Sequence, residues 1–200
     1  MPPSAVAFGI GNVLVEWDPR HVYRPLFDGD EALMEDFLTH VCSPEWQREL
    51  ERGRPWAEAV GALTAAFPEC AELIRTFHAC WADMAPGEVP GMPEIVGALK
   101  ALGVRLYGVA NAPVEGVAVL ARRFNVLGLL DGVVVSGEEG MAVPIHRRLL
   151  DRYGLVAADT LFIDAAPAGI ADAAALGMAT HHFTSAAKLR EELERLGLPS

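Results

Sequence analysis

The chain has 200 residues, of which 52% are hydrophobic and 22% are charged, with 19 Gly and 14 Pro. This balance excludes a disordered chain, a collagen-like repeat and a small disulfide-linked scaffold, and it predicts a globular protein with a substantial core. The 27 Asp and Glu residues outnumber the 16 Lys and Arg residues, and the net charge of −11 disfavours nucleic acid and membrane surfaces as partners. The first residues lack a basic and apolar leader, so a cytoplasmic location is expected.

Short apolar runs that are typical of β-strands recur along the chain. They cover residues 5–10, 104–109, 132–135, 160–163 and 179–183. Helical patterns alternate with the later runs and cover residues 94–101, 114–124, 145–153, 167–176 and 185–196. This alternation predicts an α/β fold, in which a five-stranded parallel sheet carries helices on both faces.

The long segment between the first and second predicted strands shows no strand pattern. It has helical patterns at 30–41, 44–52, 55–66 and 69–82, and a run rich in Pro and Gly at 85–91 ends it. We therefore predict a helical cap at 17–87, inserted into a core formed by 1–16 and 88–200. Four aromatic residues are expected in the core of this cap, with one or two of them on a cleft: Trp46, Trp56, Phe77 and Trp81.

Five segments of the chain, in the expected order, resemble the haloacid dehalogenase (HAD) superfamily. They are AVAFGIGNVLVEWDPRHVYRPLF, VPGMPEIVGALKALGVRLYGVANAP, VVVSGEEGMA, TLFIDAAPAGIADAAALGM and HHFTSAAKLREELERLGL. The resemblance covers nearly the whole chain. It is closest to members with a small helical cap, which include phosphatases of small molecules and 2-haloacid dehalogenases. It implies a Rossmann-like HAD core with an inserted helical cap.

The chain departs from all four catalytic motifs of that family. Gly9 stands where the family has its aspartate nucleophile, and Ala110 stands where a Ser or Thr would bind the phosphoryl group. No lysine occurs in the segment 140–146, where the family has one. The paired acidic residues that hold magnesium are reduced to Asp164, which is followed by Ala165.

These replacements remove what the family mechanism needs. Gly9 has no side chain to act as a nucleophile, and Asp164 alone is a poor site for a divalent cation, which requires several oxygen ligands. The loss of a single group that stabilises the transition state commonly costs about 10²- to 10³-fold in rate. We therefore expect no turnover by the family mechanism, no bound metal and no cofactor.

Each replacement is small or apolar, and this favours a cleft that binds or converts a mostly apolar small molecule. Conversion would be metal-independent acid–base chemistry of the isomerase, lyase or cyclase type. The alternative is a noncatalytic pseudoenzyme that acts through protein contacts, with a homodimer as one form. A weaker alternative is a residual hydrolase in which Asp18 or Asp164 acts as the nucleophile.

Four residues are candidates for acid–base work: Asp164, His146, Asp18 and His21. Each has a structural alternative, which is a helix cap for Asp164, an exposed first-turn position for His146, and caps or salt bridges for the other two. The residues expected to line the cleft are Gly9, Ile10, Gly11, Asn12, Ala110, Asn111, Val143, Ala165, Arg20 and Arg24. The cysteines Cys42, Cys70 and Cys80 lack metal-binding spacing and are expected to be free thiols.

Overall fold

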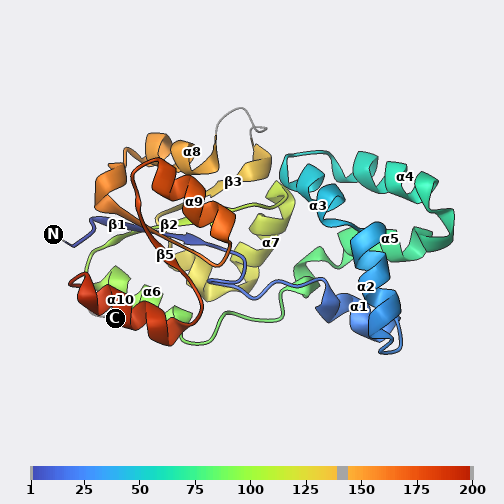
Figure 1. Cartoon of the computed structure of the whole chain (residues 1–200), viewed down its shortest axis with the longest axis horizontal. Coiled ribbons are helices and arrows are strands. Elements are labelled where there is room, and N and C mark those ends of the chain that lie inside the picture. The colour runs from blue at the N-terminus through green and yellow to red at the C-terminus, as the bar shows by residue number, and fades with distance from the viewer. Residues whose placement is uncertain (1, 139–143, 199–200) are drawn as a thin grey trace.

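A five-stranded sheet forms the centre of the protein, which a computed structural model describes at residues 2–138 and 144–198 (Figure 1). The strand order is β3-β2-β1-β4-β5, and all neighbouring strands are parallel. This confirms the predicted α/β sheet. The strands are β1 (Ala5–Gly9), β2 (Arg105–Ala110), β3 (Gly132–Val135), β4 (Thr160–Asp164) and β5 (Ala179–His182).

Helices cover both faces of the sheet, so the central strands are buried on both sides and read as continuous apolar runs. Val6 and Phe8 of β1 face one helical layer, whereas Ala5 and Ala7 face the other. The first layer consists of α6 (Met92–Ala101), α7 (Val114–Arg123) and α10 (Ala186–Arg195). The second consists of α8 (Ile145–Tyr153) and α9 (Pro167–Ala175). Among the described residues, no helix is both long and apolar enough to cross a membrane.

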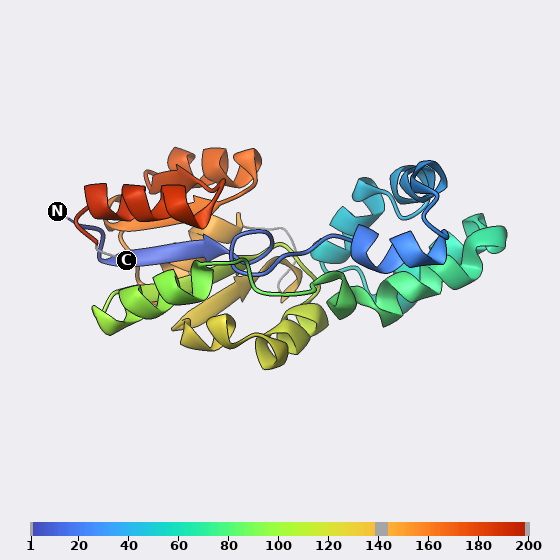
Figure 2. The same cartoon turned by 90° about the horizontal axis from the view of Figure 1, so that it is seen from below.

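A lobe of helices lies between β1 and α6 in the chain and stands beside the sheet (Figure 2). Asp30 and Ser43 begin two of its helices by accepting hydrogen bonds from the backbone N–H groups of Leu33 and Trp46. The helices are α1 (Arg20–Leu26), α2 (Glu31–His40), α3 (Pro44–Glu51), α4 (Trp56–Ala66) and α5 (Ala71–Ala79). Short 3-10 turns occur at Pro68–Cys70, Trp81–Met84, Asn125–Leu129, Ser136–Glu138 and Ala157–Asp159.

An aromatic cluster holds the helical lobe together. Phe77 lies at its centre, with ring centroids 5.1 Å from Trp46, 6.2 Å from Tyr23 and 6.4 Å from Trp56. The Tyr23 hydroxyl donates a hydrogen bond to the Leu73 carbonyl oxygen at 2.8 Å. The three cysteines are also in this lobe, and all are free thiols.

Two chain segments cross between the lobes side by side. Val15 and Glu88 form an antiparallel bridge, and the N–H of Glu16 donates to the Gly87 carbonyl at 3.0 Å. The N–H of Asp18 donates to the Met84 carbonyl at 3.0 Å. The lobes are therefore joined at a short, hydrogen-bonded crossing next to the carboxyl end of β1.

Candidate active site between the sheet and the helical lobe

An apolar cavity of about 100 Å³ lies between the carboxyl ends of β1 and β2 and the helical lobe. Ligands of parallel α/β sheets bind at this edge, and one ordered water needs only about 10–15 Å³. The cavity is therefore large enough for an organic group. Its walls are Ile10, Gly11, Asn12, Val15, Trp17, Gln47, Leu50, Glu51, Phe77, Trp81, Ala110, Asn111, Ala112, Pro113, Val117 and Leu120.

Aromatic and aliphatic side chains from both lobes dominate these walls. The rings of Trp17 and Trp81 lie 5.7 Å apart, and Phe77 adds a third ring from α5. Val117 and Leu120 face the cavity from α7 of the sheet lobe. These two and Leu50 were absent from the residues expected at the cleft, although the i, i+3 spacing of Val117 and Leu120 marks one face of a helix.

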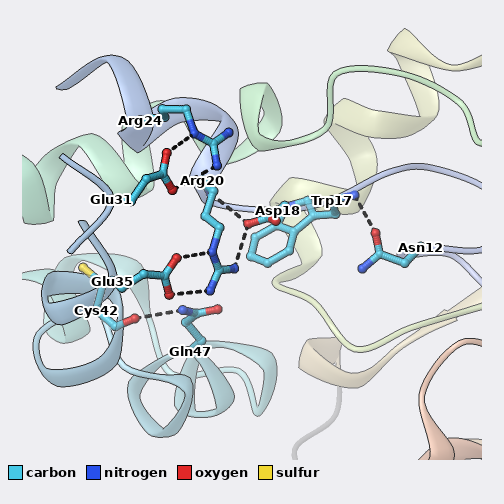
Figure 3. A network of polar contacts seen from close by, with 9 residues as sticks. All are labelled: Asn12, Trp17, Asp18, Arg20, Arg24, Glu31, Glu35, Cys42 and Gln47. Atoms are coloured by element: carbon cyan, nitrogen blue, oxygen red, sulfur yellow. Dashed lines mark hydrogen bonds and ion pairs between the residues drawn. The ribbon is translucent and has the colours of Figure 1, made fainter. Parts of the chain in front are cut away.

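The strand ends contribute five of the residues expected at the cleft, which are Ile10, Gly11, Asn12, Ala110 and Asn111. Asn12 has a left-handed backbone with φ of 60°, a conformation that Asn adopts more readily than most residues. Its Oδ1 accepts a hydrogen bond from the Trp17 N–H at 2.9 Å (Figure 3). Asn12 thus shapes the turn that brings the Trp17 ring to the cavity.

Gly9 and Ala165 line neither this cavity nor the second one described below, so the structure does not place them where the cleft was expected. The Asp164 carboxylate occupies the space beside Gly9, because a Cβ atom at Gly9 would lie 2.8 Å from Asp164 Oδ1. Asp164 Oδ1 accepts a hydrogen bond from the Ala166 N–H at 3.1 Å. Burial raises the pKa of Asp164, and hydrogen bonds from the Ala165 and Ala166 backbone lower it in part.

The magnesium ion implied by the family resemblance does not fit these residues. Within residues 2–138 and 144–198, no three His, Cys, Asp or Glu side chains lie close enough together to hold a metal ion. At the carboxyl ends of β1 and β4, Asp164 supplies one carboxylate, whereas Gly9 and Ala165 supply no oxygen from a side chain. A divalent cation would lack the ligand set that it requires.

Replacing Gly9 with aspartate should lower the free energy of unfolding at pH 7 by about 1–3 kcal/mol, because it forces a second carboxylate against Asp164. Gly9→Asn introduces a side chain of nearly the same shape without the charge, so the difference in the free energy of unfolding between the two variants measures the repulsion between the carboxylates. Urea denaturation at pH 7 and pH 5 measures both free energies, and their difference should be smaller at pH 5. Magnesium-dependent hydrolysis of p-nitrophenyl phosphate by the wild type would contradict the poor fit of the metal.

Arg20 and Arg24 do not lie on either cavity, contrary to expectation, because neighbouring acidic side chains hold them on the helical lobe (Figure 3). Arg20 contacts Asp18 at 3.1 Å and binds Glu35 through two hydrogen bonds, at 2.5 and 2.7 Å. Arg24 pairs with Glu31 at 2.5 Å.

The same arrangement places two acid–base candidates outside the cavities. The backbone N–H and the guanidinium group of Arg20 both donate hydrogen bonds to Asp18 Oδ1, and the backbone bond is 2.9 Å long. His21 is exposed on α1. Neither residue lines a cavity, so the structure does not bring this pair together with Asp164 or His146.

A second cavity of about 410 Å³, called the polar cavity for the charged residues on its walls, lies between α3 of the helical lobe and the first turns of α8 and α9. His146 lies on its wall, in the first turn of α8 as expected, but the side chain is buried with 3% exposed. Its ring packs edge-on against Phe162, and burial lowers its pKa. Val143 lies outside the described residues. The walls are Arg48, Glu51, Arg52, Asn111, Ser136, Pro144, Ile145, His146, Arg148, Ala166, Ala168, Gly169 and Asp172.

Glu51 lines both cavities and was not among the residues predicted from the sequence. Burial raises its pKa to about 7, against the opposing effect of Arg48 and Arg52. The signal that could have found it is local, because Gln47, Leu50 and Glu51 have the i, i+3, i+4 spacing of one helix face. A carboxyl group with this pKa exchanges protons readily at neutral pH.

A hydrogen bond fixes the end of α3 against the sheet lobe near Glu51. The Ser136 hydroxyl donates to the Glu51 carbonyl oxygen at 2.5 Å and accepts from the Ala112 N–H at 3.2 Å. Gly53 lies nearby with φ of 90°, and a Cβ atom there would approach the Gly137 carbonyl oxygen to 2.9 Å. Only glycine suits both this conformation and this close approach.

Comparison with known proteins places the fold. No protein-family model matches the chain. The sesquiterpene phosphatase astK of Aspergillus oryzae (strain ATCC 42149 / RIB 40) is 27% identical over 200 residues, which cover 96% of each chain. A predicted HAD-like family hydrolase from Porphyromonas gingivalis matches with a TM-score of 0.71 and 20% identity over 98% of each chain.

Two further solved structures agree. The HAD family enzyme bt-2542 of Bacteroides thetaiotaomicron has a TM-score of 0.69 and 19% identity, over 92% of this chain and 95% of that one. The L-2-haloacid dehalogenase RSc1362 has a TM-score of 0.65 and 20% identity, over 90% of this chain and 86% of that one. The predicted resemblance is confirmed, and the chain has the fold of the HAD-like hydrolases, with the helical lobe inserted after the first strand.

Proposed function

We propose that this chain binds a mostly apolar small molecule in the apolar cavity and does not hydrolyse phosphate esters through an aspartate nucleophile. The observation that carries the proposal is the set of rings and aliphatic side chains that converge on the cavity from both lobes, including Trp17, Phe77, Trp81 and Val117. Apolar contact contributes about 25 cal/mol for each Å² removed from water. The full-length relative named a sesquiterpene phosphatase supports a terpenoid as the class of ligand.

The proposal assigns any conversion of this ligand to acid–base chemistry without a metal. Glu51 is the titratable side chain on the wall of the apolar cavity, and its pKa of about 7 allows it to donate or accept a proton at neutral pH. Asp164 is turned towards the start of α9, and His146 borders the polar cavity instead. Isomerisation, elimination and cyclisation are the reaction types that one such group supports.

The second candidate function is phosphate ester hydrolysis, favoured by the name of the same relative. It requires a nucleophile at a strand end, and the Asp164 carboxylate is the one side chain there that could serve, since Gly9 has none. Loss of a magnesium-dependent activity on replacement Asp164→Ala would establish this function and overturn the first.

Titration with farnesol, an uncharged sesquiterpene alcohol, tests the proposed function. Trp17 and Trp81 lie on the cavity wall, so binding should change the tryptophan fluorescence. Val117→Phe fills the cavity from α7 and should weaken farnesol binding at least tenfold. Val119→Phe is the matched control, because it adds the same ring on the same helix at a position with 38% of the side chain exposed.

Both variants are first checked by circular dichroism, so that a loss of binding is read only from folded protein. Equal farnesol affinity in Val117→Phe and the wild type would show that the apolar cavity is not the binding site. The absence of saturable binding in the wild type would overturn the proposal. In that case the apolar walls serve packing between the two lobes.

A further inference from the structure

A close contact between α7 of the sheet lobe and the 3-10 turn Trp81–Met84 fixes one wall of the apolar cavity. The Trp81 side chain is buried, lines the cavity and lies directly on the backbone of α7 at Gly116. A Cβ atom at Gly116 would overlap Cζ3 of the Trp81 ring and would lie 2.6 Å from its Cε3 and 2.8 Å from its Cη2. A larger residue at this position would therefore force the ring and the helix apart.

A second contact holds the same turn on α7. The Arg123 guanidinium donates a hydrogen bond to the Ala82 carbonyl oxygen at 2.8 Å and contacts the Asp83 carboxylate at 3.2 Å. Gly116 and Arg123 are seven residues apart and so lie on the same face of α7. The turn is held at both positions, so moving it as a whole away from α7 would break the bonds of Arg123.

The apolar cavity offers space to a Trp81 ring that is displaced from Gly116. Val117, the next residue of α7, lines the cavity, and so does Trp17, whose ring centroid lies 5.7 Å from that of Trp81. The Trp81 ring thus has α7 on one side and the cavity on another. Glycine also weakens a helix relative to alanine, and the close approach of the ring gives Gly116 a reason to be there.

We infer that Gly116 is a positioning residue, which sets through Trp81 the length of the apolar ligand that the cavity accepts. This inference rests on the proposed function of the cavity. With glycine at this position, the ring rests on α7 and leaves the adjoining space to the ligand. An alanine would move the ring into that space. Long apolar chains therefore depend on Gly116, whereas a chain that ends before Trp81 does not meet the displaced ring.

Two uncharged alcohols test this dependence: farnesol and geraniol, which is one isoprene unit shorter. Isothermal titration calorimetry measures both affinities without relying on the fluorescence of Trp81. The wild type should bind both alcohols. Gly116→Ala should weaken farnesol about tenfold and geraniol by less than about twofold, since a hydrophobic pocket discriminates chain length on this scale. Gly97→Ala on α6 is the matched control, because a Cβ atom there meets no atom of the described residues within 4 Å.

A smaller ring at position 81 tests whether Gly116 acts through Trp81. Trp81→Phe removes the ring atoms nearest to Gly116, so the double variant Gly116→Ala/Trp81→Phe should regain most of the farnesol affinity. In the presence of Gly116, Trp81→Phe alone should shift the preference of the protein towards geranylgeraniol, which is one isoprene unit longer than farnesol. Circular dichroism first shows which variants are folded. If Gly116→Ala does not fold, this shift decides the question, and an unchanged preference overturns the inference.

The outcomes distinguish failure of this inference from failure of the proposed function. If folded Gly116→Ala binds farnesol and geraniol as the wild type does, the inference is wrong and the proposed function stands. Equal weakening of both alcohols, without recovery in the double variant, also overturns the inference, because Gly116 would then act only on the contact between the lobes. If the wild type binds neither alcohol, the proposed function fails and this inference fails with it.

Discussion

Replacing Phe77 with alanine should lower the free energy of unfolding by about 3–5 kcal/mol, the cost of removing a large buried ring. The Phe77 side chain has 1% of its surface exposed and contacts the rings of Tyr23, Trp46 and Trp56. Its removal leaves a cavity at the centre of the helical lobe. This lobe is too small to fill the cavity by moving other buried side chains into it.

Urea denaturation followed by circular dichroism and by tryptophan fluorescence measures this loss, and agreement of the two signals shows whether both lobes unfold together. Leu33→Ala on α2 is the control, since Leu33 has 59% of its side chain exposed and should change stability by less than about 0.5 kcal/mol. A loss below about 1 kcal/mol for Phe77→Ala would mean that the aromatic cluster does not hold the lobe.

Glu51→Gln should stabilise the protein above neutral pH and have little effect in acid. Burial raises the pKa of Glu51 from 4.5 to about 7 in the folded state. Between these values the folded state keeps the proton that the unfolded state releases, so stability falls as the pH rises through this window. Above pH 7 the wild type bears the full cost of a buried carboxylate, about 1–3 kcal/mol after allowance for its partial exposure.

Denaturation at pH 4.5 and pH 8 measures this difference, and the gain of Glu51→Gln should appear at pH 8 alone. Glu69→Gln, at an exposed position of the same lobe, is the matched control. A gain of the same size at both pH values would show that the amide acts through packing or a new hydrogen bond. A loss at pH 8 would show that the carboxylate is stabilised by its arginine neighbours.

Most of the fold follows from local sequence patterns. The apolar runs that predict strands match the five strands of the sheet, because strands buried on both faces need continuous apolar residues. The helix α1 was not predicted, since Pro25 lies inside it and lacks the N–H of a helix interior. The helix expected at 69–82 is broken at Cys80, where Trp81 turns to pack against Gly116 of α7.

Of the residues that line the candidate site, only those contributed by the sheet could be predicted from the sequence. Residues that follow β1 and β2 share one edge of the sheet because parallel strands end together, so Ile10 and Ala110 could be placed from the sequence. The spacing of Gln47, Leu50 and Glu51 marks one face of α3, but only the docking of α3 shows that this face meets the cavity, and Glu51 was missed for that reason. The position of Arg20 could not be derived from local sequence, because its partner Glu35 lies on a neighbouring helix of the lobe.

The hydrogen bond from Ser136 to the Glu51 carbonyl has a consequence for the rate of ligand exchange. The apolar cavity is bounded on one side by the crossing segments at Val15 and on the other by this bond near Ala112. The helical lobe is thus hinged along one edge and latched along the other. A ligand whose passage requires the helical lobe to move away from the sheet must break this bond, so we expect its residence time to depend on how often the latch opens.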